Sequence, residues 1–530
     1  MQGQRSFTST TSLAASSATL TYGSSLDAIL VGGDAGGEPS FNATMVIGLK
    51  PSLDAVMPSL LDTLGLDIAD PVKTTMMEAI NEKTGGQSST MVALDDKYAH
   101  KVSFCGLPTK ISRNNHPMSV HQLSKYAGSA LGKGSTRIVV VTDNPVAPLA
   151  LALQKAYPEF SMKSSKLKAA DATSDEASSS TRKVHAVFMR SDGTIVDSVQ
   201  ELQAADAASQ GAKLAARLVD SHPELLTTTQ FAKEVEAIVQ EYPDKIKMTQ
   251  IIGNELKSYG GLYGVGKGAN CPPRLVVLEY DGGNGDESVE SVALVGKGIV
   301  YDTGGLSLKT RAGMSGMKHD MGGAAGMLGG FYSAVKLGVK KKVYLLLCLA
   351  ENAIGPDSFR NDDILRMYSG KTVEVNNCDA EGRLVLGDGV AHATKHFEGL
   401  DLVVDMATLT GAQLVATGKK HAGILANTEE LERRAIKAGM HSGDLVYPLL
   451  YAPELLMNEF KSEVADMKNS VKDRSNAQTS CAGHFIEAHL DESYEGGWLH
   501  VDMAGPGTLG QRGTAYGVGL VLSLLEAPGF

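Results

Sequence analysis

The sequence predicts a protein of two α/β domains: a smaller N-terminal one, and a C-terminal one with a mainly parallel sheet covered by helices on both faces. Three observations support this prediction. The chain has 530 residues, which is too long for one hydrophobic core. Apolar residues make up 43% of it and charged residues 21%, as in soluble globular proteins. Short β-branched runs alternate with segments whose apolar residues recur at helical spacing, as in strand–helix–strand crossovers.

The smaller α/β domain is expected to cover residues 26–202. Before it, residues 1–25 are rich in Ser and Thr and are expected to be disordered. Three apolar runs in the domain are predicted strands: residues 28–32, 44–49 and 137–142. Residues 161–183 contain almost no apolar side chain, so we interpret them as a disordered insertion, after which another strand covers residues 183–189.

A connecting helix is expected at residues 203–222, because this Ala-rich segment has apolar residues at helical spacing and ends at a proline. The C-terminal domain then covers residues 223–530. Its first helix is expected at residues 227–242, with Thr229 as the N-cap. Strands and helices alternate after it, with strands at 291–301, 342–350 and 401–407 and helices at 322–337 and 383–397.

Charge and hydropathy exclude several classes of protein. The 49 basic and 60 acidic side chains give a net charge of −11, which argues against a nucleic-acid partner. No apolar run approaches the roughly 18 residues that span a bilayer, so we expect no membrane partner. Five scattered cysteines indicate no disulfide framework and favour a reducing compartment. A cytoplasmic location is therefore expected, with organellar targeting by the Ser/Thr-rich N-terminus as a minor alternative.

The first polar motif is VGKGIVYDTGGLSLKTRAGMSGMKHDMGG at residues 295–323. A predicted strand runs into Asp302, two glycines turn the chain, and Lys309 and Asp320 follow. Taken alone, this motif also fits a glycine-rich strand end with ordinary surface charges. His319 is the only histidine in the cluster, and a structural or positioning role is expected for it.

The second motif is NNCDAEGRL at residues 376–384. Its charged residues Asp379, Glu381 and Arg383 occupy alternate positions, so in an extended chain all three project to the same side. Three charged groups on one side of a stretch that leads into a helix are poor material for a core. This pattern favours a functional site over a surface strand.

The two motifs together indicate a metal centre. Four carboxylates, those of Asp302, Asp320, Asp379 and Glu381, are expected at the carboxyl edge of the sheet, where open α/β folds bind ligands. Carboxylates that converge there repel one another unless cations neutralise them. Two divalent metal ions bridged by carboxylates would do so. The oxygen-rich ligand set suits Mg²⁺ or Mn²⁺, and Zn²⁺ is also compatible with it.

Both motifs resemble those of the leucyl aminopeptidase family of dinuclear metallopeptidases (the M17 class), whose second signature is NTDAEGRL. The resemblance continues through PPRL at residues 272–275, ATLTGA at 407–412 and WLHVDMAGP at 498–506. It covers the C-terminal three-fifths of the chain. It implies a metal-dependent aminopeptidase that removes N-terminal residues, preferably leucine-like ones, from peptides by means of a hydroxide activated by two metal ions.

The resemblance also implies a ligand set. Two divalent ions, Zn²⁺ or Mn²⁺ with Mg²⁺ or Co²⁺ as alternatives, would be bound by Lys297, Asp302, Asp320, Asp379 and Glu381. Asp302 and Glu381 would contact both ions. Lys297 can act as a ligand only as a neutral amine, which two neighbouring dications could enforce. Without the resemblance, Lys297 would be interpreted as an ordinary salt-bridge lysine.

Roles in catalysis and substrate binding follow from the same resemblance. Lys309 would polarise the scissile carbonyl, and Arg383 would anchor a bicarbonate ion that serves as the general base. Met317 would line the side-chain pocket, with core packing as its alternative, and Leu409 and Gly411 would offer backbone hydrogen bonds to the peptide. Homohexamers are usual in the family, so a homo-oligomer that acts on peptides is expected.

One departure from the family pattern is Cys378, which stands where the family has threonine. Its effect on metal preference is left open. Three alternative functions are also open: a dipeptidase such as a cysteinylglycinase on the same site, a nucleic-acid-binding or scaffolding member, and an inactive member of the family. The negative charge and the complete ligand set argue against the last two.

Overall fold

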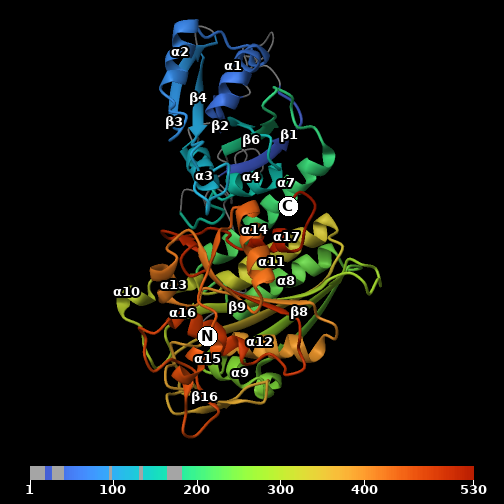
Figure 1. The fold of residues 1–530 in the computed structure, drawn as a ribbon, viewed down its shortest axis with the longest axis vertical. Helices are drawn as coiled ribbons and strands as arrows, with labels where there is room; N and C mark the ends of the chain where they lie inside the picture. The colour runs from blue at the N-terminus through green and yellow to red at the C-terminus, as the bar shows by residue number, and fades with distance from the viewer. Residues whose placement is uncertain (1–17, 27–40, 95–97, 130–134, 164–181) are drawn as a thin grey trace, which may run out of the picture.

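The computed structural model describes residues 18–26, 41–94, 98–129, 135–163 and 182–530, which form two α/β domains joined end to end (Figure 1). The N-terminal domain contains a six-stranded sheet in the order β1-β6-β5-β2-β4-β3. Its strands are β1 (Ala18–Gly23), β2 (Ala43–Leu49), β3 (Gly86–Ala93), β4 (Ala99–Leu107), β5 (Thr136–Val141) and β6 (Arg182–Met189). Neighbours pair in parallel except β3, which is antiparallel to β4.

Helices cover both faces of this sheet. They are α1 (Lys50–Leu64), α2 (Asp70–Glu78), α3 (Val120–Ser129) and α4 (Val146–Gln154). Side chains alternate along the buried strands: Met45 and Ile47 of β2 pack in the core that includes α3 and α4, whereas Val46 packs in the core that includes α1 and α2. A continuous apolar run is thus buried on both faces, and the strands predicted at residues 44–49 and 137–142 are observed as β2 and β5.

Two predicted boundaries in this domain are wrong. Residues 18–23, expected to be disordered, form β1, which pairs in parallel with β6 in a register that joins Ala18 to Arg182. Leu20 and Tyr22 of β1 pack against the core. The strand was not predicted because its apolar residues alternate with threonines within a Ser/Thr-rich stretch. Lys183 also belongs to β6, so the expected insertion 161–183 extends too far. The predicted strand 28–32 and residues 164–181 lie outside the described residues.

The C-terminal domain contains an eight-stranded sheet in the order β15-β14-β17-β13-β9-β10-β8-β7. Its strands are β7 (Ile246–Ile252), β8 (Arg274–Asp281), β9 (Ser291–Asp302), β10 (Lys342–Asn352), β13 (Leu402–Ala407), β14 (Ala422–Ala426), β15 (Val446–Pro448) and β17 (Gly497–Asp502). The four central strands β17, β13, β9 and β10 are parallel, while β8, β7 and β14 add antiparallel pairs. The predicted fold class is therefore observed, with antiparallel strands toward both edges.

Helices lie on both faces of this sheet as well (Figure 1). One face carries α7 (Val199–Asp220), α8 (Thr228–Glu241), α11 (Gly322–Leu337), α14 (Glu429–Ser442) and α17 (Val518–Leu524). The other carries α9 (Gly260–Gly266), α12 (Gly382–His396) and α16 (Gln478–Glu487). Helix α11 lies very close to the sheet, since a Cβ on Gly296 of β9 would be 2.6 Å from the Cα of Ala324. Glycine is therefore required at that point of contact.

Shorter elements complete the domain. The strands are β11 (Ile364–Arg366), β12 (Thr372–Glu374), β16 (Met467–Lys468), β18 (Thr508–Leu509) and β19 (Arg512–Gly513). The helices are α10 (Arg311–Met314), α13 (Gly411–Ala416), α15 (Pro453–Leu456), η1 (Gly253–Ser258), η2 (Met317–His319) and η3 (Met457–Phe460). Within the described residues, no helix is long and apolar enough to cross a bilayer.

Helix α7 connects the two domains and contributes to both cores. Ala205 packs in the N-terminal core, and Ala208 and Ala212 pack in the C-terminal one. The helix begins earlier than predicted because the Ser198 hydroxyl accepts a hydrogen bond from the backbone N–H of Glu201.

The predicted cap of α8 is also wrong. Thr227, not Thr229, caps this helix, and its hydroxyl accepts from the backbone N–H of Gln230. The Thr229 hydroxyl instead accepts a hydrogen bond from Arg274 of β8. Three consecutive threonines at residues 227–229 made the two positions hard to distinguish by sequence alone.

A buried carboxylate, Asp444, ties the domains together. It pairs with Lys155, which follows α4 of the N-terminal domain, and accepts hydrogen bonds from the backbone N–H groups of Gly517, Gly519 and Leu520 at the start of α17. Its side chain is 1% exposed. Removing it would leave one cation and several N–H groups without their acceptor.

We therefore expect Asp444→Ala to lower the free energy of unfolding by about 3 kcal/mol. Lys155→Met, which keeps the acceptor for the N–H groups, should cost about 1 kcal/mol. The chain has a single tryptophan, Trp498 in β17, so its fluorescence during urea unfolding reports on the C-terminal domain. Equal effects of the two substitutions would contradict the role of Asp444 as the acceptor for the N–H groups at the start of α17.

Candidate metal centre

The central strand β9 supplies the first two charged groups of the site. Lys297 lies within β9 and Asp302 is its last residue, at the carboxyl edge of the sheet. Asp320 follows η2, directly before α11, and Asp379 and Glu381 precede α12. The topology therefore gathers the four predicted carboxylates beside one strand end, where parallel sheets bind ligands.

The local conformation of the second motif differs from the prediction. Residues 378–379 form a turn instead of an extended stretch, and Arg383 lies in the first turn of α12, where the sequence predicts a helix over 383–397. The helix starts at Gly382, where an added Cβ would be 2.6 Å from the Nζ of Lys297. The turn and the helix start still direct Asp379, Glu381 and Arg383 toward one cavity. The three side chains therefore project to the same side, as predicted, but they do so through a turn and a helix start and not as alternate residues of an extended chain.

Two lysines contact the four carboxylates. The Nζ of Lys297 lies 2.8 Å from Asp320 and 3.0 Å from Glu381. The Nζ of Lys309 lies 2.8 Å from Asp302 and also pairs with Asp379. Four carboxylates against two ammonium groups leave an excess of two negative charges in one cluster.

This excess charge is buried. Lys297, Asp302 and Glu381 are each 2% exposed, and Asp320 is 7% exposed. Burial and the nearby Glu381 raise the pKa of Asp302 to about 6, against the opposing effect of the two lysines. Burial also raises the pKa of Asp320 well above its ordinary value. Burial alone would lower the pKa of Lys297, but the surrounding carboxylates outweigh it and raise that pKa.

The residues fit divalent metal ions. Ligand oxygens of Asp302, Asp379 and Glu381 lie within 4.8 Å of one another. The Oε2 atom of Glu381 is buried and has no hydrogen-bond donor among the described residues. An unpaired buried carboxylate oxygen is costly unless a cation coordinates it. Oxygen donors at this density are the ligands that hard and borderline divalent ions prefer.

Two further residues position the carboxylates, and the sequence analysis missed both. Asn352, at the end of β10, donates through Nδ2 to Asp302 (2.8 Å) and to the carbonyl of Cys378 (3.1 Å). Thr408, after β13, donates its hydroxyl to Asp320 (2.8 Å), and its carbonyl accepts from Lys297 (3.0 Å). Each follows or ends a central parallel strand beside β9, and that placement is the signal that could have identified them.

Cys378 is buried beside the centre, and its thiol is engaged elsewhere. The Sγ atom donates to the carbonyl of Phe359 (3.5 Å) and to Asn361 (3.4 Å). Burial raises the pKa of this thiol, so it remains protonated at neutral pH and is a poor nucleophile. His319 is also buried, and burial lowers the pKa of its imidazole, which keeps the ring neutral.

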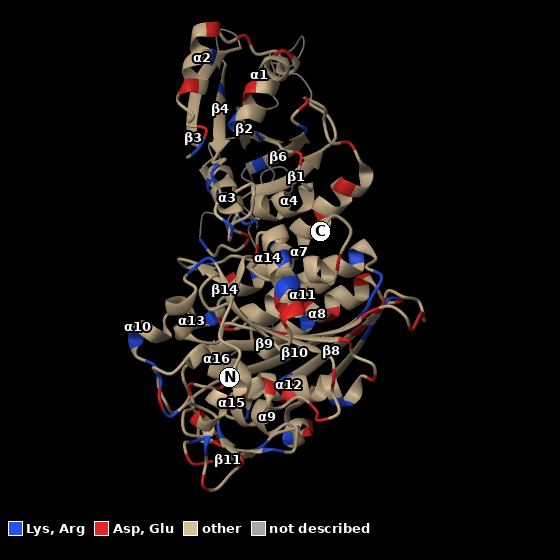
Figure 2. Cartoon of the chain, in the orientation of Figure 1, with Lys and Arg blue, Asp and Glu red and all other residues tan. Residues whose placement is uncertain are grey.

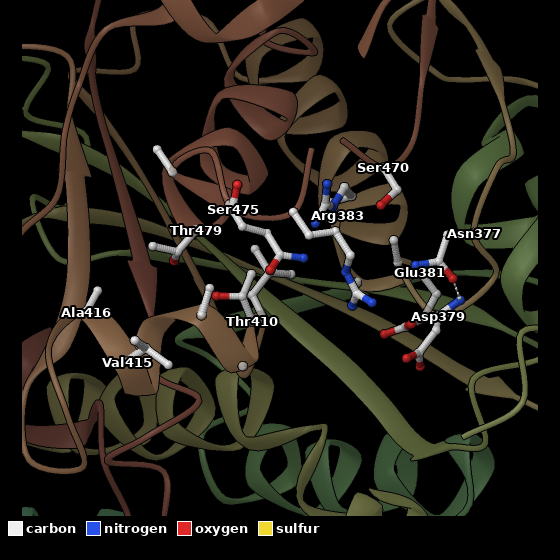
Figure 3. Close-up of a pocket in the computed structure, with 18 of the residues that line it drawn as sticks. Asn377, Asp379, Glu381, Arg383, Thr410, Val415, Ala416, Ser470, Ser475 and Thr479 are labelled. Carbon is white, nitrogen blue, oxygen red and sulfur yellow. Dashed lines mark hydrogen bonds between the residues drawn. The ribbon is translucent and has the colours of Figure 1, made fainter. Parts of the chain in front are cut away.

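A cavity of about 670 Å³ opens beside the carboxylates (Figure 3). Its lining includes the predicted residues Lys309, Asp379, Glu381, Arg383, Leu409 and Gly411. Met317 is not among the lining residues; it begins η2 and is half-buried there. Lys297, Asp302 and Asp320 lie buried behind the wall formed by Lys309 and Glu381.

The Arg383 guanidinium extends into this cavity between Thr410 and Glu381 (Figure 3). Its Nη1 donates to the carbonyl of Asn469 (3.0 Å), and its buried Nε has no acceptor among the described residues. Burial lowers the pKa of Arg383 to about 10, so the group is still a cation at neutral pH. A buried cation with an unpaired N–H next to the start of a helix favours an anionic partner.

The chain is similar to known peptidases over most of its length. Residues 213–524 match the catalytic domain of the cytosol aminopeptidase family. "Probable aminopeptidase NPEPL1" of Mus musculus is 45% identical over 432 residues, which cover 81% of this chain and 80% of that protein. Leucine aminopeptidase 1 of Caenorhabditis elegans is 40% identical over 426 residues, 79% of this chain and 82% of that protein. The structure of leucyl aminopeptidase from Trypanosoma brucei in complex with actinonin superposes with a TM-score of 0.84 at 36% identity, covering 96% of each chain.

Proposed function

Since the chain belongs to the cytosol aminopeptidase family and is a metal-dependent hydrolase of peptides, we propose that it removes N-terminal residues, preferably leucine-like ones. The family predicted from the two sequence motifs is thus confirmed, and the matched region contains both of them. The observation that carries the proposal is the set of four carboxylates and two lysines, of which three residues line one cavity and the other three are buried directly behind them. This set can neutralise and orient a free amino terminus as well as metal ions.

The proposed ligand set has two parts. Lys297, Asp302, Asp320 and Glu381 would hold one ion, and Asp302, Asp379 and Glu381 would hold the other. When bound, two such ions supply Lewis-acid activation of water and of the scissile carbonyl. Lys297 is protonated in its ion pairs with Asp320 and Glu381, so it must release its proton before it can serve as a ligand. Zn²⁺ or Mn²⁺ fit this mixed oxygen and nitrogen set, with Mg²⁺ or Co²⁺ as alternatives.

Lys309 and Arg383 would act on the substrate side. The neighbouring carboxylates keep Lys309 protonated, because they outweigh the effect of burial and raise its pKa. Its side chain is 17% exposed at the cavity wall, where it can stabilise the oxygen on which negative charge develops. Arg383 would hold a bicarbonate ion as general base, and the backbone of Leu409 and Gly411 would align the peptide. The contact of Met317 with the substrate side chain stays a prediction, since this residue is outside the cavity lining.

A homohexamer in the cytoplasm is the further part of the proposal. Several large apolar side chains of the C-terminal domain are exposed in the single chain, among them Leu450, Leu455 and Val464. Such residues are commonly covered by a neighbouring subunit. Sedimentation of the purified protein would give the number of subunits directly.

A panel of aminoacyl amides tests the proposed activity. Metal-free protein is reloaded with Zn²⁺, Mn²⁺, Mg²⁺ or Co²⁺ in turn, and kcat/KM is measured for leucinamide, alaninamide, aspartamide and N-acetyl-leucinamide. We expect leucinamide to be the best substrate and N-acetyl-leucinamide to be resistant, because acetylation removes the free amine. Hydrolysis of the acetylated substrate at an equal rate would contradict the exopeptidase assignment.

Two alternatives give different results. A cysteinylglycinase would hydrolyse Cys-Gly in preference to leucinamide under the same conditions. A nucleic-acid-binding member would retain DNA in a filter-binding assay at low salt. Acidic and basic residues are interspersed over both domains in Figure 2, which does not favour that second alternative.

A further inference from the structure

We propose that Arg474 binds a carboxylate on the leaving-group side of the substrate, so that the enzyme favours short peptides with a free carboxyl group. This inference rests on the proposed aminopeptidase activity and adds a substrate class to it. Arg474 lies on the segment between β16 and α16 and lines the same cavity as Glu381 and Arg383. None of the sequence motifs pointed to this residue.

The cavity has two chemically different ends. Asp379 and Glu381 lie at one end, next to Lys309. Ser475, from the segment that carries Arg474, and Thr479, in the first turn of α16 that follows it, lie on the opposite side of Arg383 (Figure 3). A peptide whose amino terminus binds at the acidic end therefore extends its leaving group toward the segment that contains Arg474.

Arg474 is the charged residue of that second end. Five residues of the cavity lining are charged: Lys309, Asp379, Glu381, Arg383 and Arg474. The first three belong to the carboxylate–lysine cluster, and Arg383 is buried and held by a backbone carbonyl. Arg474 is exposed and has no ion pair among the described residues.

The local sequence keeps this guanidinium available. The neighbouring acid, Asp473, accepts hydrogen bonds from both the backbone N–H and the hydroxyl of Ser475, at 2.8 Å and 2.7 Å. Those bonds to Ser475 hold the Asp473 carboxylate within a turn. The backbone N–H of Asp473 also donates to the carboxylate of Glu459. The side chain adjacent in sequence that could neutralise Arg474 is thereby engaged elsewhere.

The size of the cavity suits a short peptide. A volume of about 670 Å³ is within the usual range for small-ligand sites. An extended residue spans roughly 3.3–3.6 Å, so the terminal carboxylate of a dipeptide or tripeptide lies roughly 7–10 Å from its amine. Arginine binds carboxylates through two parallel N–H groups, which gives such a contact both energy and direction.

The test compares acids with amides in the metal-loaded enzyme. Leu-Gly and Leu-Gly-amide differ by the terminal charge alone, and Leu-Asp-amide carries a carboxylate on its side chain instead. In the wild type we expect kcat/KM for Leu-Gly to exceed that for its amide. In Arg474→Ala this ratio should fall by about threefold to tenfold, the range of a partly exposed Arg–carboxylate pair, and the change should be in KM.

Lys472→Ala is the matched control, because Lys472 is an exposed cation on the same segment that does not line the cavity. It should keep the wild-type ratio. A loss confined to Leu-Asp-amide would assign Arg474 to an acidic side chain instead of the terminal carboxylate. An unchanged ratio in Arg474→Ala, with leucinamide still hydrolysed, would overturn this inference. Failure of the wild type to hydrolyse leucinamide would overturn the proposed function instead.

Discussion

Removal of divalent metal ions with a strong chelator is expected to abolish peptide hydrolysis while the protein stays folded. The fold should persist because Lys297 and Lys309 neutralise part of the carboxylate charge without any ion, through contacts with Asp320, Glu381 and Asp302. Activity should be lost because a lysine ammonium group can neutralise a carboxylate but cannot act as the Lewis acid that activates water. Circular dichroism and elemental analysis on the same sample would separate loss of metal from loss of structure.

Substitution of the shared ligands should have the largest effect of any single change. Asp302→Ala and Glu381→Ala each remove a carboxylate that is proposed to contact both ions, so we expect kcat/KM to fall on the order of 10³-fold or more. Metal content should fall with it. Glu429→Ala is a suitable control, because Glu429 is an exposed carboxylate on α14 that pairs with Arg433. Full hydrolysis by protein shown to be metal-free would refute the mechanism.

The central strands could be predicted from the sequence because both of their faces are buried. The run from residue 291 to Asp302 is almost entirely buried in β9, and a strand buried on both faces is mostly apolar, with Lys297 as the charged exception within this one. Its final residue then falls at the carboxyl edge of the sheet, which is why Asp302 could be placed beside the other carboxylates from sequence alone. An edge strand such as β1 gives a much weaker signal, since one of its sides faces solvent and its alternation is short.

Contacts between distant segments could not be predicted in the same way. Asn352 lies 50 residues from Asp302 in the sequence, and nothing in its local pattern shows that β10 pairs with β9 in a register that brings the two together. The alternation of Asp379, Glu381 and Arg383 predicts an extended stretch, although the same three residues also fit a turn followed by a helix start. The structure decides between them through Gly382, which leaves room for Lys297. Arg474 gave no signal either, because its availability depends on where Asp473 is held.

The two lysines of the centre are expected to fail differently when they are replaced. Lys297 would have to donate a lone pair to a metal ion, and arginine is always protonated, so Lys297→Arg should lose metal as well as activity. Arginine is also larger, and the Nζ of Lys297 is already packed against Gly382. Thermal unfolding of this variant should therefore be measured beside its metal content, and Lys297→Met provides a variant without a charge or a long head group.

Lys309→Ala should keep both metal ions while kcat collapses. Lys309 pairs with Asp302 and Asp379 at the cavity wall but is not a proposed ligand, so its loss removes a positive charge that faces the developing oxyanion. Losing one such electrostatic contact costs about 10²–10³ in rate. Lys309→Arg should retain part of the activity, because the charge survives in a different position. Metal content and kcat measured on the same purified variants separate the two roles. If Lys297→Arg binds two ions normally, the role of Lys297 as a ligand is wrong. If Lys309→Ala loses an ion, the role of Lys309 as a group that acts only on the substrate is wrong.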